Sequence, residues 1–169
     1  MKVLFIASAY PRAAEDIITP WLVEMIRRLQ ARGIVVEVLA PAYRGLGNQI
    51  LHDVQVHRFR YAPARWETLT HDQTAPDRIR QRPLFLALVP FYILAGSFAA
   101  ARLARSGAFD LVHVFWPMPH GIIGIAAKSF AGVPLVCTFF GVELTWVDAQ
   151  LPFLRPVIGM IVRASDAIT

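Results

Sequence analysis

The 169-residue sequence contains little cysteine and little lysine. Its one cysteine, Cys137, lies in the apolar run 133–140, which excludes a disulfide framework and predicts a reducing compartment, the cytoplasm. Only Lys2 and Lys128 are lysines among 17 basic residues, and the arginines form no dense basic run, which disfavours nucleic-acid binding. The net charge of +5 suits phosphate-bearing ligands or anionic lipid surfaces, although genome base composition would produce the same excess of arginine.

The sequence also lacks the motifs of several enzyme classes. No glycine precedes Gly33, so the first strand-to-helix turn has no G-x-G-x-x-G motif, and the second predicted strand ends in Ala40-Pro41 rather than in a carboxylate that would bind a ribose. Nicotinamide and flavin binding are therefore disfavoured. No serine lies in a G-x-S-x-G context, and no histidine or cysteine has metal-ligand spacing, so we expect neither a metal nor a cofactor.

Apolar strand-like runs alternate with helical patterns, which is typical of a parallel β-sheet covered by helices on both faces. The predicted fold class is α/β, a Rossmann-like doubly wound parallel sheet, with one domain over residues 1–169. The expected spatial order is third, second, first, fourth, fifth and sixth strand. Because the tail resembles the opening of a strand, we expect a chain truncated before a further domain. The six predicted strands are 3–8, 35–40, 54–61, 110–116, 135–140 and 165–169.

Helical patterns and one long loop connect these strands. Thr19 before Pro20 predicts a capped helix start, and Gly33 marks the end of that helix. Residues 62–82 carry prolines, charges and polar residues without periodicity, which predicts a long, mobile or functional loop. Further helices are expected over 119–131 and 151–163.

Residues 83–101 carry no charge over nearly the length of a bilayer span. Pro90 and Gly96 lie inside the segment, and the third and fourth strands need a connecting helix, so a buried crossover helix is preferred to a transmembrane helix. Its apolar body exceeds what such a helix must bury, and arginines flank it. We therefore expect an exposed patch over 78–105 that contacts an anionic membrane surface, unless a further domain or a second copy covers it.

Ligands of open α/β sheets bind beyond the carboxyl ends of the strands. After the first strand, Arg12 can meet a phosphate at the next helix N-terminus or remain a solvated loop residue. After the fourth, Trp116 can stack on a sugar and His120 can donate a hydrogen bond to a ligand, the alternative for both being simple packing. His113, inside that strand, is more typical of a structural histidine. After the fifth strand, Gly141 allows close backbone approach to a ligand, and Glu143 can hold hydroxyl groups or cap the following turn.

Several segments form an ordered pattern along nearly the whole chain. They are K-V-L-F-I at 2–6, Y-P-R at 10–12, R-G-I-V-V-E-V-L-A-P at 32–41, R-F-R-Y-A-P at 58–63, D-L-V-H at 110–113, W-P-M-P-H-G at 116–121, P-L-V-C-T-F-F-G-V-E at 134–143, and A-S-D-A-I at 164–168. The pattern resembles the N-terminal domain of the group 1 (family 4) glycosyltransferases, the retaining enzymes of GT-B fold.

This resemblance implies the acceptor-side half of a GT-B enzyme, with transfer of a sugar from a nucleoside-diphosphate sugar to an acceptor hydroxyl, with retention and without an obligatory metal. The nucleotide-sugar donor would be held mainly by a C-terminal domain that this chain lacks, and the acceptor would be a glycan or glycolipid, such as a lipid-linked or polysaccharide precursor. The resemblance and the strand-end positions together assign His120 and Glu143 to catalysis, and Tyr10, Arg12, Trp116 and Gly141 to substrate binding.

The chain departs from the family pattern at three positions. Phe115 and Phe140 stand where the family usually has histidines, and Glu143 replaces the usual aspartate. In the family, the histidine at the position of Phe140 lines the cleft near the donor sugar. Its loss leaves open either a divergent enzyme, in which His120 substitutes, or a degenerate, non-catalytic module that binds a sugar or a lipid.

Overall fold

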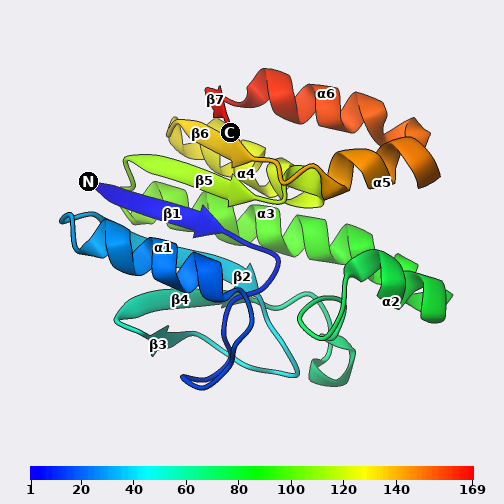
Figure 1. Cartoon of the computed structure of the whole chain (residues 1–169), viewed down its shortest axis with the longest axis horizontal. Coiled ribbons are helices and arrows are strands. Elements are labelled where there is room, and N and C mark those ends of the chain that lie inside the picture. The colour runs from blue at the N-terminus through cyan, green and yellow to red at the C-terminus, as the bar shows by residue number, and fades with distance from the viewer.

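The computed structural model describes residues 1–169, except for the side chain of Gln150. Its centre is a seven-stranded sheet with the spatial order β3-β4-β2-β1-β5-β6-β7 (Figure 1). The strands are β1 (Lys2–Ile6), β2 (Val35–Pro41), β3 (Gln49–Leu51), β4 (Val54–Phe59), β5 (Leu111–Phe115), β6 (Leu135–Thr138) and β7 (Ala167–Ile168).

The predicted strand order is confirmed for the six strands that the sequence indicates. Each of these pairs in parallel with its neighbour, from β4 through β2, β1, β5 and β6 to β7. The prediction missed β3, which runs antiparallel to β4 at the edge of the sheet. The connecting residues His52 and Asp53 both have positive φ, as a two-residue hairpin turn requires, but no glycine or asparagine signals this turn in the sequence.

Helices cover both faces of the sheet, as the α/β pattern predicts. In β1, Val3 and Phe5 pack in a cluster with α1, whereas Leu4 and Ile6 pack in a second cluster with α3 and α4 (Figure 1). The α-helices are α1 (Pro20–Gln30), α2 (Ala75–Gln81), α3 (Leu88–Ser106), α4 (Pro117–Ala131), α5 (Val142–Gln150) and α6 (Arg155–Ala164), with 3-10 turns η1 (Ala64–Trp66), η2 (Pro83–Ala87) and η3 (Pro152–Leu154).

Helix α1 begins and ends close to the predicted residues, but the predicted cap is wrong in its chemistry. Thr19 occupies the N-cap position in a left-handed conformation, and its side chain makes no capping hydrogen bond. At the other end, Gly33 has φ 76°, and the amide of Ile34 donates to the carbonyl oxygen of Leu29 at 3.1 Å. Glycine thus supplies the positive φ that turns the chain out of the helix.

The loop predicted over 62–82, mobile or functional, is more ordered than the sequence indicates. This segment contains η1 and α2, and its anchor is Glu67, which is completely buried. The Glu67 carboxylate accepts hydrogen bonds from the Arg60 guanidinium and from the amide of Gly45, the latter at 2.8 Å. The Thr74 hydroxyl then caps α2 by accepting from the amide of Asp77. Long-range partners, invisible in local periodicity, order this segment.

Helix α3 is the predicted crossover between β4 and β5, and it packs against α4. The expectation that it is buried is only partly right. The segment Pro83–Ser106 is long and apolar enough to span a membrane, but only 22% of its most apolar 18 residues are buried. Tyr92, Gly96, Ala100 and Ala104 form the buried face of α3.

The last three helices differ from prediction mainly in their bounds. Helix α4 begins at Pro117, but Met118 has non-helical angles, so its continuous part begins at the predicted Pro119; it ends at Ala131 with Gly132, whose φ is 69°, as the predicted C-cap. The sequence did not predict α5, and the helix expected from residue 151 begins only at Arg155, after η3. The N-terminus of α5 therefore lies directly after β6, at the edge of the sheet where ligands of this fold class bind.

Candidate functional site

Two turns in unusual backbone conformations follow β5 and β6. Trp116 has φ 52° and lies immediately before α4, and Gly141 has φ 87° and lies immediately before α5. A left-handed conformation is unremarkable for glycine but costs free energy for tryptophan. Strained residues of this kind cluster at ligand sites, so the carboxyl edge of β1, β5 and β6 is the candidate site.

His120 lies at this edge in the chain, but its side chain is only 3% exposed. Its Nδ1 atom lies 3.1 Å from the carbonyl oxygen of Trp116 and its Nε2 atom lies 2.8 Å from the hydroxyl of Tyr92. A carbonyl can only accept, so Nδ1 carries the proton and Nε2 accepts from Tyr92. Burial lowers the pKa of His120 to about 4. The neutral imidazole thus supports the Trp116 turn from inside the fold, and its predicted catalytic role stays a prediction.

Glu143 performs one of its two predicted tasks in this structure. It lies in the first turn of α5, is 7% exposed, and its Oε1 atom accepts a hydrogen bond from the amide of Phe140 at 3.1 Å. Its Oε2 atom is buried and has no hydrogen-bond partner among the described residues. The carboxylate therefore holds the turn through one oxygen and leaves the other without a partner among the described residues.

An aromatic cluster borders these turns. The Trp116 and Phe140 rings lie 4.7 Å apart between centroids, and Trp21 of α1 contacts both at 5.4 and 5.2 Å. Trp116 is half-buried and Phe140 is 44% exposed, so the cluster presents ring surface on which a sugar can stack. Sequence reasoning missed Trp21, because its position in an amphipathic helix gives no sign that it extends toward the ends of the strands.

The two phenylalanines at the family's histidine positions differ in location. Phe115 is completely buried and packs against Phe5 and against His113, whose ring centroid lies 4.3 Å away. His113 also lies 2.7 Å from the Thr138 hydroxyl through Nε2, as a satisfied structural histidine would, and burial lowers its pKa to about 4. Of the two positions, therefore, Phe140 is the more exposed at the site.

Tyr10 is enclosed in the core cluster that includes Phe115, and Arg12 is ion-paired in the loop after β1. Tyr10 is completely buried, and burial raises its pKa to about 12. The Arg12 guanidinium donates to Asp16 at 2.5 Å and to Asp72 at 3.3 Å. These carboxylates neutralise the charge that was predicted to meet a phosphate, and the substrate-binding roles of both residues stay predictions.

Arg58 is a positioning residue that sequence reasoning missed. It is only 6% exposed, and its guanidinium donates to the carbonyl oxygens of Tyr10 at 3.2 Å and Pro11 at 2.6 Å, which holds the loop after β1. Burial lowers its pKa to about 10. A signal was present, because Arg58 continues the alternation of the buried Val54 and Val56 along β4.

No group of three or more histidine, cysteine, aspartate or glutamate side chains within the described part of the chain could hold a metal ion. The Glu143 carboxylate, the aromatic cluster and Gly141 lie together at the turns after β5 and β6.

Two comparisons with known proteins bear on this site. A family model described as "Glycosyl transferase 4-like domain" matches residues 18–169 of the chain. A curated protein of Bacillus anthracis, N-acetyl-alpha-D-glucosaminyl L-malate synthase, is 30% identical over 82 residues, which is 47% of this chain and 21% of that protein. The matched region thus spans about a fifth of the length of this relative.

Proposed function

Because the chain belongs to the glycosyl transferase 4-like family of domains, we propose that it is the acceptor-side half of a retaining GT-B glycosyltransferase. The donor is a nucleoside-diphosphate sugar, held mainly by a second domain, and the acceptor is a hydroxyl of a glycan or glycolipid. The single observation that carries the proposal is the buried, unpartnered Oε2 atom of Glu143 in the first turn of α5, beside the positive-φ Gly141.

The proposed reaction is a substitution at the anomeric carbon. The acceptor hydroxyl oxygen forms the new bond to this carbon, the bond from the carbon to the diphosphate oxygen breaks, and the hydroxyl proton leaves with the diphosphate. Glu143 Oε2 accepts a hydrogen bond from a sugar hydroxyl and fixes the ring against Trp116 and Phe140. Stabilisation of the departing diphosphate falls to the second domain.

Phe140 supports a second candidate, a non-catalytic module that binds a sugar or a lipid. It stands where the family usually has a histidine, and a phenyl ring neither donates nor accepts a proton. The nearby His120 is buried with both ring nitrogens engaged, so it does not replace that histidine in this conformation. The aromatic cluster binds a ring in either case, and only transfer separates the two candidates.

We further propose that the outward face of α3 contacts the membrane from the cytoplasmic side. Phe91, Leu94 and Phe98 follow a helical spacing and are 60%, 67% and 74% exposed. Arg102 and Arg105 extend this face toward the end of α3. An apolar strip that ends in arginines complements acyl chains and anionic headgroups, and would bring a lipid-linked acceptor to the protein.

Sugar transfer by the protein in its complete form tests the proposal, with a panel of nucleoside-diphosphate sugars and with glycan and lipid-extract acceptors. We expect Glu143→Ala to lower kcat/KM by about tenfold to a hundredfold, because a hydrogen bond to a charged group is lost. The control is Glu15→Ala in the exposed loop before α1.

Two results would reject the catalytic proposal. One is equal activity of the Glu143→Ala and Glu15→Ala proteins. The other is sugar binding without transfer from any donor, which would favour the non-catalytic module. The 169-residue chain by itself should transfer no sugar, because the donor-binding groups would lie on the other half.

A further inference from the structure

A cavity of about 520 Å³ lies apart from the candidate site, beyond the carboxyl ends of β2 and β4. Its volume falls within the ~300–1,000 Å³ that is typical of ligand sites. Four arginines and one carboxylate line it, so its wall carries a strong excess of positive charge. The lining residues are Arg44, Ala64, Arg65, Thr68, Asp72, Arg78 and Arg82.

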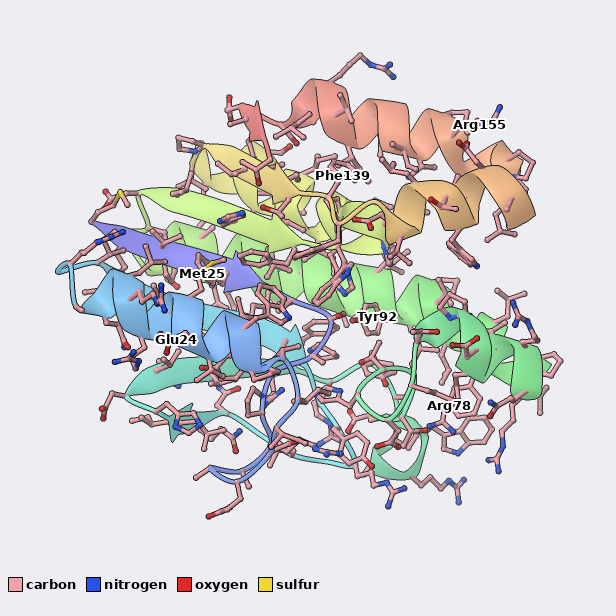
Figure 2. The ribbon with its side chains drawn as sticks, viewed as in Figure 1. Glu24, Met25, Arg78, Tyr92, Phe139 and Arg155 are labelled. Atoms are coloured by element: carbon pink, nitrogen blue, oxygen red, sulfur yellow. The ribbon has the colours of Figure 1, made fainter. Side chains whose placement is uncertain are left out.

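Three separate segments bring these arginines together. Arg44 lies in the loop after β2, and Arg65 lies in η1, after β4. Arg78 lies in α2, and Arg82 is the C-cap residue of this helix, whose amide donates to the carbonyl oxygen of Arg78 at 2.9 Å. Figure 2 shows Arg78 at α2, on the side of the molecule to which the parallel strands point.

Buried Glu67 fixes the first two segments to each other. Its carboxylate accepts from the amide of Gly45, and its carbonyl oxygen accepts from the amide of Arg44 at 3.2 Å. Both Arg44 and Arg65 are therefore attached within one or two residues of a rigid junction. This limits the entropy that their alignment on a ligand would cost.

The one carboxylate in the wall is already shared. Asp72 accepts from the Tyr43 hydroxyl at 3.0 Å, from Arg12 at 3.3 Å and from Arg78 at 3.4 Å. Within the described residues, neither Asp72 nor any other carboxylate forms an ion pair with Arg44, Arg65 or Arg82. The buried Nε atom of Arg78 also has no hydrogen-bond partner there. The cavity thus has guanidinium groups, those of Arg44, Arg65 and Arg82, that its one carboxylate does not pair with.

We propose that this arginine cavity binds a phosphoryl group, either a phosphate monoester or a diphosphate. Guanidinium groups present paired donors that match the oxygens of a phosphate, and several of them around one cavity favour a ligand with more than one negative charge. Binding here is independent of sugar transfer. The phosphoryl group comes from a soluble phosphorylated molecule or from a phospholipid headgroup, which the exposed Leu84 and Leu86 beside Arg82 would bring close.

Titration of the chain with inorganic phosphate and pyrophosphate, at constant ionic strength set by chloride, tests the soluble source. The variant is the double substitution Arg65→Gln/Arg82→Gln, at two exposed side chains. We expect its dissociation constant to rise about tenfold or more. The matched control is Arg32→Gln/Arg163→Gln, which removes the same amount of charge. These two exposed arginines precede β2 and β7, at the amino ends of the strands and away from the cavity, so this variant should bind phosphate like the wild type.

Vesicles of phosphatidylcholine mixed with either phosphatidic acid or phosphatidylglycerol test the lipid source. A preference for phosphatidic acid that is lost in the Arg65→Gln/Arg82→Gln protein but kept in the control assigns the site to a headgroup. Phosphate binding that is lost in the same variant without a vesicle preference assigns it to a soluble ligand. If the two double variants behave alike in both assays, the proposal is overturned, whatever the outcome of the sugar-transfer assay.

Discussion

The hydroxyl oxygen of Tyr92 lies 2.8 Å from Nε2 of His120, within the packing of α3 against α4. This hydrogen bond joins the long crossover helix to the residue that holds the carbonyl of Trp116. Figure 2 shows Tyr92 along α3, on the side that faces the rest of the fold. The conformation of the turn after β5 thus depends on a buried hydrogen bond between α3 and α4.

Removing this hydroxyl should destabilise the fold. In Tyr92→Phe, Nε2 of His120 stays buried without a donor, so we expect the free energy of unfolding to fall by about 1–3 kcal/mol. The control is Tyr10→Phe, since Tyr10 is equally buried but its hydroxyl has no hydrogen-bond partner among the described residues. Urea denaturation should show little change for Tyr10→Phe. An equal loss in both variants would contradict this account of the Tyr92 contact.

Acid should destabilise the protein through its buried histidines. Burial lowers the pKa of His71, His113 and His120 from 6.5 to about 4. Between pH 4 and pH 6.5 the unfolded chain binds more protons than the folded protein does. The free energy of unfolding therefore keeps its full histidine contribution above about pH 6.5 and decreases as the pH falls toward 4. Each histidine contributes a slope of about 1.4 kcal/mol per pH unit.

Urea denaturation at several pH values measures this slope. The His113→Gln protein should lose about one third of it, because one of the three groups no longer titrates. The control is His52→Asn in the exposed turn between β3 and β4, where asparagine tolerates the positive φ. A pH profile of His113→Gln that matches that of the wild type would show that His113 is not protonated on unfolding.

Gly124 should not tolerate a methyl group. A Cβ atom at this position of α4 would lie 2.6 Å from a methyl carbon of Val114 and 2.8 Å from one of Leu135. Alanine usually stabilises a helix relative to glycine, but overlap with two strands should reverse the sign, with a loss of about 1–3 kcal/mol. Gly47→Ala is the control, because nothing lies within 4 Å of its added Cβ atom. Thermal unfolding that ranks the two variants equally would contradict the close helix-to-sheet approach.

Membrane contact through α3 predicts binding to anionic vesicles that weakens with salt. Flotation with anionic and neutral liposomes measures it, and Phe91→Ser/Phe98→Ser should abolish the binding by removing two exposed rings. Phe130→Ser is the control, because Phe130 is also exposed, at 65%, but lies at the end of α4. If the protein binds neither kind of vesicle, the membrane proposal is rejected, and a further domain or a second copy that covers the exposed face of α3 becomes the better explanation.

The strand order was predictable because it depends on patterns that are local in sequence. Apolar runs, Gly33 and Gly132 indicate strands and helix ends within a few residues. By contrast, β3 is only three residues long and turns into β4 through His52 and Asp53, which do not signal a hairpin turn in the sequence. The order within residues 62–82 depends on Glu67, a charged residue that sequence reasoning would place at the surface.

The site was predictable in location but not in the environment of its side chains. Strand ends identify Trp116, Gly141 and Glu143, and all three lie at the turns after β5 and β6. Position in the chain says nothing about which way a side chain points, and His120 turns inward toward α3. The arginine cavity was not foreseen because its members are separated by up to 38 positions, from Arg44 to Arg82.

The second carboxylate oxygen of Glu143 links stability to recognition. A buried acceptor without a donor costs about 1–3 kcal/mol, and the fold bears this cost in the ligand-free state. In the proposed complex, a sugar hydroxyl that donates to Oε2 would remove this cost, and the gain would add to the affinity for the ligand. An apolar side chain at position 143 would avoid this cost, but it would leave the amide of Phe140 without its acceptor and would remove the proposed means of distinguishing a sugar from a hydrocarbon.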